Sequence, residues 1–141
     1  MQEYIDFIGE NPLHFIGFVV ILALIIKLES SRLTRKFKMV NTNEAVKLMN
    51  NDDTIVVDVR EDKEIKGGIL QNAQHITLGQ LSDRIGHLGT NKEVPILVYC
   101  RTGTRSTSAC NTIVKAGFEN VSSLAGGIVA WETANLPTAK R

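Results

Sequence analysis

The residue with the clearest chemical potential in this sequence is Cys100, which follows an apolar run at residues 96–99. The run is rich in β-branched and aromatic side chains, as in a fully buried strand of a parallel sheet, and Pro95 suits its first position. The cysteine therefore falls at the carboxyl end of the strand, where open α/β sheets bind their ligands. An ionised thiol at this position would be a nucleophile.

The segment after Cys100 has the residue types that stabilise an anion. It consists of Arg101, Thr102, Gly103, Thr104, Arg105 and Ser106. The backbone N–H groups of such a loop can surround an anion, and the dipole of a following helix favours negative charge at the same place. Gly103 permits a tight turn, and the two guanidinium groups add positive charge. We therefore predict a cradle for an anionic sulfur, or for an oxyanion in contact with it.

The spacing of apolar residues predicts a helix after this loop. These residues are Ala109, Cys110, Ile113 and Val114, and Gly117 is the predicted C-cap. Because Cys110 lies on the apolar face, we interpret it as a core residue rather than a second reactive thiol. A buried structural thiol is also the alternative for Cys100, since free cysteines are often buried. The loop of glycine and arginine favours reactivity there.

Three motifs resemble those of the rhodanese family of sulfurtransferases. CRTGTRS (100–106) resembles the active-site loop, AGFENVSSLAGGIVAW (116–131) the closing signature, and IVVDVRE (55–61) the strand with the D-x-R motif. The resemblance covers roughly residues 39–137 and is to a single-domain, membrane-anchored bacterial type. It implies a five-stranded parallel sheet and a catalytic Cys100 that carries a persulfide. It also implies persulfide and substrate binding by the loop residues, with no metal and no organic cofactor.

The sequence departs from the family pattern in one segment, where E-F-x-x-G-H-I-x-G-A-x-N-I reads EIKGGILQNAQHI. Ile69 replaces the His of the pattern, and His75 replaces its Asn. In the family, the resemblance implies, this His is the polar partner of the Asp that corresponds to Asp58. Because Ile69 cannot take that role, we expect Asp58 to pair with Arg60 or Arg105 instead. His75 ends a predicted strand and is interpreted as structural rather than as a base.

Asp58 and Arg60 are the predicted supporting residues of the site, because they leave their strand at the same sheet edge as Cys100 if the strands are parallel. Capping of the next helix is the alternative role for Asp58. Arg60 is expected to orient the loop or a substrate anion, with an ion pair to Glu64 as its alternative.

Strands and helices alternate along residues 39–141 with short connections, which predicts an α/β fold with a doubly wound parallel sheet. The other predicted strands are 39–40, 54–59, 74–78 and 121–124. Three other helices are predicted. One begins after Thr42 as its N-cap, one spans 79–88, and one contains the core residue Trp131; a short helical turn is also predicted at 61–66. In the second of these, Leu81, Ile85 and Leu88 are expected to face inward.

The N-terminal part predicts a membrane anchor. Residues 15–26 are apolar throughout, and the predicted transmembrane helix extends over 12–28 because Pro12 suits a helix start and Lys27 can reach the interface. The tail 1–11 is acidic, whereas the linker 29–38 contains Arg32, Arg35, Lys36 and Lys38. The positive-inside rule therefore places the N-terminus outside and the domain 39–141 in the cytoplasm, at the inner membrane. A signal peptide and a soluble helix are the alternatives.

Composition excludes several other classes. The 141 residues include only two Cys and three His, without a C-x-x-C or paired-His spacing, so we expect neither a disulfide framework nor a zinc site. The net charge of +1 gives no basis for nucleic-acid binding. A reducing cytosol would keep Cys100 as a free thiol.

Three functions fit these observations. The leading one is a sulfurtransferase that moves sulfane sulfur from a small anionic donor such as thiosulfate, or from a persulfide, through a Cys100 persulfide to cyanide or a thiol acceptor, which could belong to a protein. A phosphatase or arsenate reductase is the second, but only four residues separate Cys100 from Arg105. Rhodanese-like phosphatases have one residue more. The third is a membrane-tethered interaction or redox-sensing module with little turnover.

Overall fold

The computed structural model describes residues 12–33 and 36–140. The chain divides into two compact units, Met1–Arg35 and Lys36–Arg141, and each is described here by itself. The predicted acidic tail, Arg35 of the predicted linker and the side chain of Arg32 lie outside the described residues. The exact limits of tail, anchor, linker and domain therefore stay predictions.

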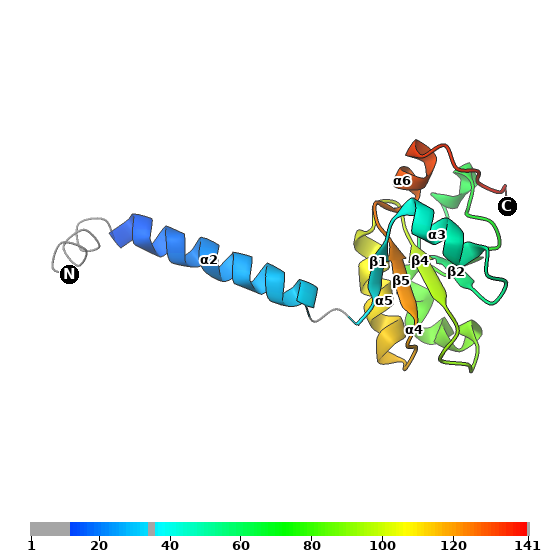
Figure 1. The fold of residues 1–141 in the computed structure, drawn as a ribbon, viewed down its shortest axis with the longest axis horizontal. Helices are drawn as coiled ribbons and strands as arrows, with labels where there is room; N and C mark the ends of the chain where they lie inside the picture. Colours follow the sequence, from blue (N-terminus) through cyan, green and yellow to red (C-terminus); the bar gives the residue numbers. More distant parts are fainter. Residues whose placement is uncertain (1–11, 34–35, 141) are drawn as a thin grey trace. The chain divides into compact units, whose positions relative to one another are not determined.

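The described part of the first unit is the helix α2 (Pro12–Leu33), drawn in blue in Figure 1. Its stretch Pro12–Ser30 has a mean hydropathy of 2.1, and its apolar side chains are exposed in this unit. By length and composition α2 could cross a membrane, and a signal sequence near the N-terminus would have the same properties.

The second unit is built on a five-stranded parallel sheet, which confirms the predicted fold class. The strands are β1 (Lys38–Val40), β2 (Ile55–Asp58), β3 (Gln74–His75), β4 (Ile96–Tyr99) and β5 (Val121–Leu124). Their order across the sheet is β1-β5-β4-β2-β3, and every pairing is parallel (Figure 1). The central strand β4 is buried along its whole length, as its continuous apolar run predicts.

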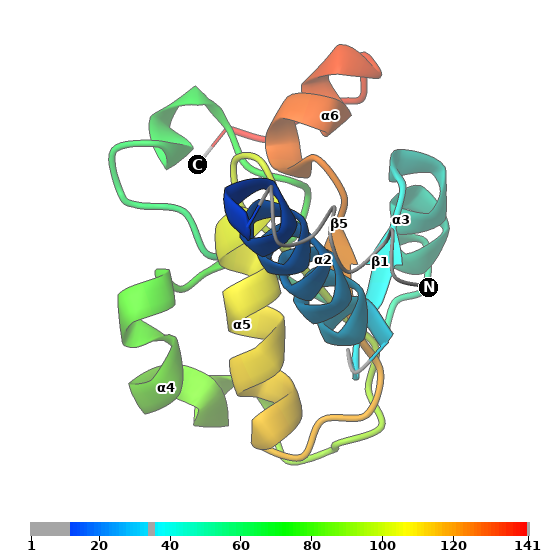
Figure 2. The ribbon, with the colours of Figure 1, turned by 90° about the vertical axis from the view of Figure 1, so that its left-hand side faces the viewer.

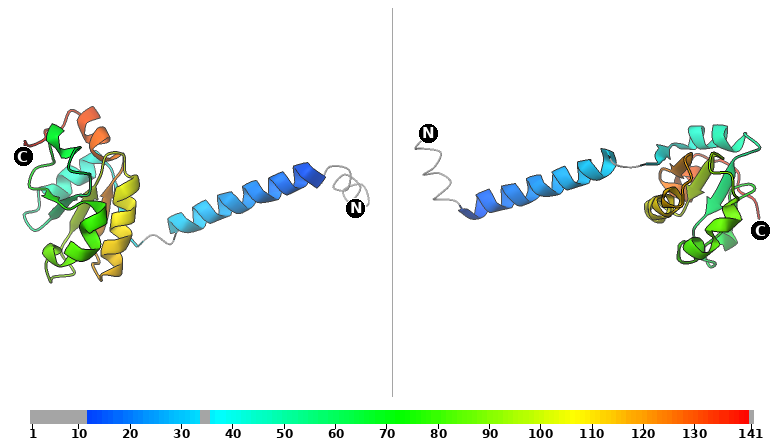
Figure 3. Two further views of the ribbon diagram at one scale, coloured as in Figure 1. Left: turned by 180° about the vertical axis from the view of Figure 1, so that it is seen from behind. Right: turned by 90° about the horizontal axis from the view of Figure 1, so that it is seen from below.

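Helices cover both faces of this sheet. Helix α3 (Thr42–Met49) lies on one face, and α4 (Leu81–Arg84) and α5 (Thr104–Lys115) lie on the other (Figure 2). The right-hand view of Figure 3 shows the sheet between these layers. Helix α6 (Gly127–Thr133) packs with α3 on the first face, where Ile128 and the predicted core residue Trp131 are buried.

The N-cap prediction for α3 is wrong by one residue. Asn41, not Thr42, caps the helix, because Asn41 Oδ1 accepts a hydrogen bond from the Glu44 N–H at 2.9 Å. The Glu44 carboxylate in turn accepts the Asn41 N–H at 2.8 Å. This reciprocal arrangement is a capping box. Thr42 is the first residue of the helix itself, so it does not occupy the N-cap position.

Several predicted boundaries also shorten in the structure. The predicted strands 54–59 and 74–78 are reduced to β2 and β3. The predicted helical turn is a 3₁₀ turn, η1 (Ile65–Gly67). The helix predicted at 79–88 is interrupted: α4 is flanked by the 3₁₀ turns η2 (Leu78–Gln80) and η3 (Ile85–Leu88). Gly86 in this segment disfavours a continuous helix, although Leu81 and Leu88 are buried as expected.

Helix α5 ends close to its predicted position. Its C-cap is Ala116, and Gly117, which was predicted as the cap, follows it with a φ of 97°. A glycine adopts this left-handed conformation at little cost, so it ends the helix from the position just beyond the cap.

Candidate active site

Cys100 lies where the sequence predicts, directly after β4 and at the carboxyl edge of the sheet. Strands β2 and β4 pair so that Asp58 is beside Tyr99, which brings the D-x-R segment and the cysteine to the same edge. The Cys100 residue is only 1% exposed. A reaction partner must therefore present a small reacting atom to this sulfur.

The Cys100 sulfur is surrounded by hydrogen-bond donors of its own loop. The Gly103 N–H donates to Sγ at 3.1 Å, and the Ser106 hydroxyl oxygen lies 3.7 Å from Sγ. Burial alone would raise the pKa of the thiol, but hydrogen bonds from Ser106, Gly103 and Thr102 together lower it below its ordinary value. The loop therefore favours the thiolate, the reactive form of cysteine.

Gly103 and Ser106 give the loop its shape. Gly103 has a φ of 104°, a left-handed conformation that favours glycine. The Ser106 hydroxyl donates to the Gly103 carbonyl at 3.0 Å, which closes the loop onto the first turn of α5. Three of the other predicted binding residues, Arg101, Thr102 and Thr104, are exposed at the rim.

The start of α6 holds the same loop from the opposite side, a feature that the sequence interpretation did not identify. The Ile128 N–H donates to the Cys100 carbonyl at 2.9 Å, and the Val129 N–H donates to the Arg101 carbonyl at 3.2 Å. A Cβ at Gly127 would lie 2.5 Å from backbone atoms of Cys100 and Arg101. The Gly-Gly pair of the closing motif was the available signal for this close approach.

Arg105 points to a carboxylate that was not among the predicted site residues. Its guanidinium makes two hydrogen bonds to Glu64, of 2.6 and 2.7 Å. This fork-to-fork pair is the strong form of an ion pair. It holds the pKa of Glu64 at about 2, chiefly through the hydrogen bond from Arg105. Arg105 is therefore positioned near the loop, with its charge largely balanced.

The pair of Arg105 and Glu64 should make stability depend on pH. We expect Glu64→Gln to lower the free energy of unfolding by about 1 kcal/mol at pH 7, because one partner of a half-buried ion pair is lost. A carboxyl whose pKa is lowered by folding stabilises the fold above its unfolded pKa, and this contribution is lost as the pH falls toward 2. Thermal unfolding of both proteins should show a smaller difference at pH 3 than at pH 7; an equal difference at both would contradict this.

Asp58 and Arg60 form a buried pair with each other. The Arg60 Nη2 lies 2.7 Å from Asp58 Oδ2, and its Nε lies 3.0 Å from both carboxylate oxygens. The remaining donors of Arg60 reach the carbonyls of Glu64, at 3.2 Å, and Gly68, at 2.7 Å. Arg60 thus holds the segment that carries Glu64.

These contacts decide between the alternatives left by the sequence. Asp58 does not cap the next helical turn, η1, whose N-cap is Glu64. Of the two partners expected for Asp58, the structure shows Arg60 and not Arg105. The alternative ion pair of Arg60 with the Glu64 side chain is wrong, because that carboxylate is bonded to Arg105. The supporting role of both residues in catalysis stays a prediction.

His75 and Cys110, the two remaining titratable candidates, are held in the fold away from solvent. His75 Nε2 lies 2.7 Å from the Arg60 carbonyl and Nδ1 lies 3.6 Å from Asp62, with the ring nearly buried. Cys110 is fully buried in the core, as predicted. Burial raises the pKa of Cys110 to about 12, so this thiol is protonated at neutral pH.

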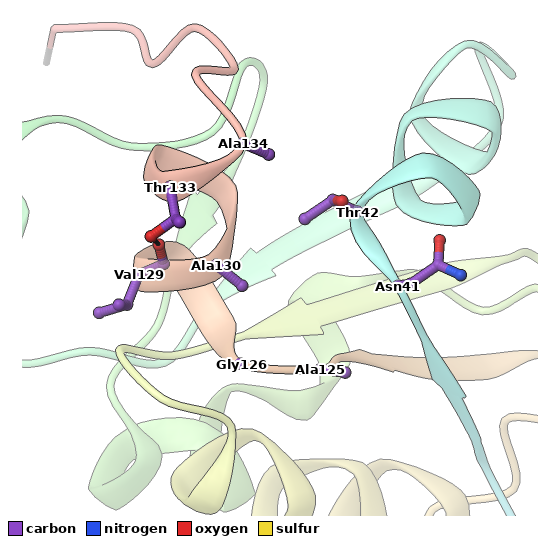
Figure 4. Close-up of a pocket in the computed structure, with 8 residues that line it drawn as sticks. All are labelled: Asn41, Thr42, Ala125, Gly126, Val129, Ala130, Thr133 and Ala134. Atoms are coloured by element: carbon purple, nitrogen blue, oxygen red, sulfur yellow. Dashed lines mark hydrogen bonds between the residues drawn. The ribbon is translucent and has the colours of Figure 1, made fainter.

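Two surface hollows lie near the loop. One of about 200 Å³ is lined by Arg60, Glu64, Gly67, Arg101, Ile128, Val129 and Glu132. A second, of about 450 Å³, lies between the start of α3 and α6 and is drawn in Figure 4. None of the side chains that line it is ionisable, so this hollow has no group for acid–base catalysis. Among the described residues, no cluster of His, Cys, Asp or Glu could hold a metal ion.

The sequence of this chain is similar to those of several known proteins. The family model described as "Rhodanese-like domain" matches residues 41–134. The protein YibN of Escherichia coli (strain K12), described as uncharacterized, is 28% identical over an alignment of 141 positions that covers 99% of each chain. Thiosulfate sulfurtransferase GlpE of Coxiella burnetii (strain RSA 493 / Nine Mile phase I) is 33% identical over 103 residues, or 73% of this chain and 94% of GlpE.

A solved structure shows the same similarity. The solution structure of the polysulfide-sulfur transferase homodimer from Wolinella succinogenes has 28% sequence identity and a TM-score of 0.69. The match covers 84% of this chain and 90% of that chain.

Proposed function

Because the chain belongs to the rhodanese-like domain family, whose members among its relatives include sulfurtransferases, we propose that it transfers sulfane sulfur through a persulfide on Cys100. The observation that carries the proposal is the position of the Cys100 sulfur, inside a loop whose N–H groups lower its pKa. The same donors would stabilise the persulfide anion that forms on Cys100.

The proposed reaction has two displacement steps. In the first, the Cys100 thiolate attacks the outer sulfur of thiosulfate; a new S–S bond forms, the old S–S bond breaks, and sulfite leaves with the electron pair. In the second, an acceptor nucleophile attacks the terminal sulfur of the persulfide, and the Cys100 thiolate is regenerated. Cyanide yields thiocyanate, and a thiol yields a new persulfide. The exposed Arg101 would attract an anionic donor, whereas the charge of Arg105 is largely balanced by Glu64.

The tight loop supports sulfur rather than phosphoryl transfer. The Gly103 N–H lies 3.1 Å from Sγ, and the thiol has almost no exposed surface. A tetrahedral phosphoryl group would need donors set around three oxygens. A single sulfur atom needs far less room.

The proposal is tested on the full chain in detergent. After incubation with thiosulfate, intact-mass measurement should show an adduct of one sulfur atom, and cyanide should discharge it with many equivalents of thiocyanate. An adduct with one persulfide donor but not with thiosulfate would identify the donor class. Accessible Cys100 that accepts sulfur from neither donor would contradict the proposal and favour a binding module.

We also propose that α2 anchors the chain in the inner membrane, with the domain 39–141 in the cytoplasm. The exposed apolar side chains of α2 need a cover in water, and Lys36 and Lys38 follow the helix as the positive-inside rule requires. The basic residues would contact anionic headgroups. The acceptor could then be a thiol of a protein at the membrane.

The anchor has its own test. The chain should stay in the membrane pellet after an alkaline wash, whereas Val20→Asp with Leu24→Asp should release it, because two charges disfavour insertion of α2. The intact mass of the membrane-bound protein separates an anchor from a signal sequence. A mature chain without α2 would contradict the proposed anchor.

A further inference from the structure

A buried serine on β5 connects the sheet to the reactive loop. Ser123 has no exposed surface. A hydroxyl in such a place is unfavourable unless it is hydrogen-bonded. The Ser123 Oγ lies 2.8 Å from the Oγ of Ser106, whose hydroxyl oxygen is the one that lies 3.7 Å from the Cys100 sulfur. The hydrogen-bond network of the thiol therefore extends past the loop to the central sheet.

Ser106 has one proton to share among three neighbours. Its hydroxyl lies within hydrogen-bond reach of the Gly103 carbonyl, the Ser123 hydroxyl and the Cys100 sulfur. While Cys100 is a thiol, its S–H donates to Ser106, and Ser106 donates to Gly103. An ionised sulfur can only accept, and a hydrogen bond to an anion is stronger than one to a carbonyl. Ionisation therefore favours rotation of the Ser106 O–H toward the sulfur.

This rotation leaves the Gly103 carbonyl satisfied. It also accepts from the Thr107 N–H at 3.2 Å and from the Thr107 hydroxyl at 3.0 Å. The lone pairs of Ser106 then face Ser123, which can donate into them. Hydrogen bonds arranged head to tail polarise one another, so a donor behind Ser106 strengthens the bond that Ser106 makes to the sulfur.

We propose that Ser123 is a positioning residue for sulfur transfer, and that it stabilises the anionic sulfur of Cys100 through Ser106. The role in turnover rests on the proposed function, but the effect on the thiol needs no sulfur donor. It can therefore be measured separately.

The charged and titratable groups around Cys100 do not themselves change charge in the pH range in which the alkylation of Cys100 is measured. The hydrogen bond to Glu64 raises the pKa of Arg105, Glu64 has a pKa of about 2, and burial raises the pKa of Cys110 to about 12. Between about pH 5 and pH 10, the rate of thiol alkylation at Cys100 therefore reports the ionisation of Cys100 itself.

The test measures alkylation of Cys100 by iodoacetamide across this range, in the full chain in detergent, with the modified residue identified by peptide mass. Ser123→Ala should move the midpoint of the profile to higher pH and lower the rate at pH values below that midpoint about fivefold, the factor that one ordinary hydrogen bond contributes. Ser122→Ala is the matched control, because its side chain points to the other face of β5. Ser123→Thr keeps the hydroxyl and should restore the profile.

A double-mutant cycle separates a path through Ser106 from a general loss of packing. In the background of Ser106→Ala, the substitution Ser123→Ala should have no further effect on the profile. An unchanged profile in Ser123→Ala, or an equal shift on top of Ser106→Ala, would overturn the proposal. A shifted profile in a chain that transfers no sulfur would contradict the proposed function, and with it the role of Ser123 in turnover, but would leave the effect of Ser123 on the Cys100 thiol standing.

Discussion

Replacing Cys100 by serine should abolish the sulfur adduct and lower the rate of thiocyanate formation by at least about a thousandfold. A serine hydroxyl is not ionised at neutral pH, and the N–H groups of the loop cannot lower its pKa enough to make it a comparable nucleophile. The side chains are nearly equal in size, so the fold and the loop should persist. The measurement is intact mass after thiosulfate, followed by thiocyanate release.

The matched control is the second cysteine. Cys110 is fully buried, and its pKa of about 12 leaves almost no thiolate at neutral pH. Cys110→Ala should therefore keep the adduct and most of the rate. An adduct that persists in Cys100→Ser and disappears in Cys110→Ala would place the reactive sulfur on Cys110 and contradict the assignment.

The sequence predicted the reactive edge of the domain because that edge is built from local patterns. The apolar run before Cys100 specifies a buried strand, and the apolar spacing after Ser106 specifies a helix. The short loop between them has to bring its N–H groups around the cysteine sulfur. Each of these inferences needs only neighbouring residues, and the structure places all three elements as expected.

The partners across the sheet edge could not be predicted in the same way. Glu64 meets Arg105 across 41 positions of the chain, a contact that depends on the path of the segment after β2. Arg60 fixes that path through two carbonyl groups, and carbonyls carry no signal in a sequence. The ends of β2 and β3 were misplaced for a related reason, since the pairing of strands and not the residue type ends a ladder.

Of the glycines in the domain, Gly127 should be the one at which alanine is most destabilising. We expect Gly127→Ala to lower the free energy of unfolding by about 3 kcal/mol or more. Gly127 has a φ of 59°, which is unfavourable for alanine. The new Cβ would also lie 2.5 Å from the Arg101 backbone, and backbone cannot move aside as a flexible side chain can. Either α6 or the loop after Cys100 must shift. Denaturant unfolding gives the stability, and alkylation of Cys100 reports the loop.

The matched control for this change is Gly79→Ala, since a Cβ there meets nothing within 4 Å and the residue does not have a positive φ. We expect it to change the free energy of unfolding by less than about 1 kcal/mol. If Gly127→Ala keeps wild-type stability and a wild-type alkylation profile, the close contact between α6 and the loop is not what holds the loop in place. If stability falls while the profile is unchanged, α6 has moved and the loop keeps its own shape. A fall in both is the expected result, because the amides of α6 bind the very carbonyls that flank the Cys100 sulfur.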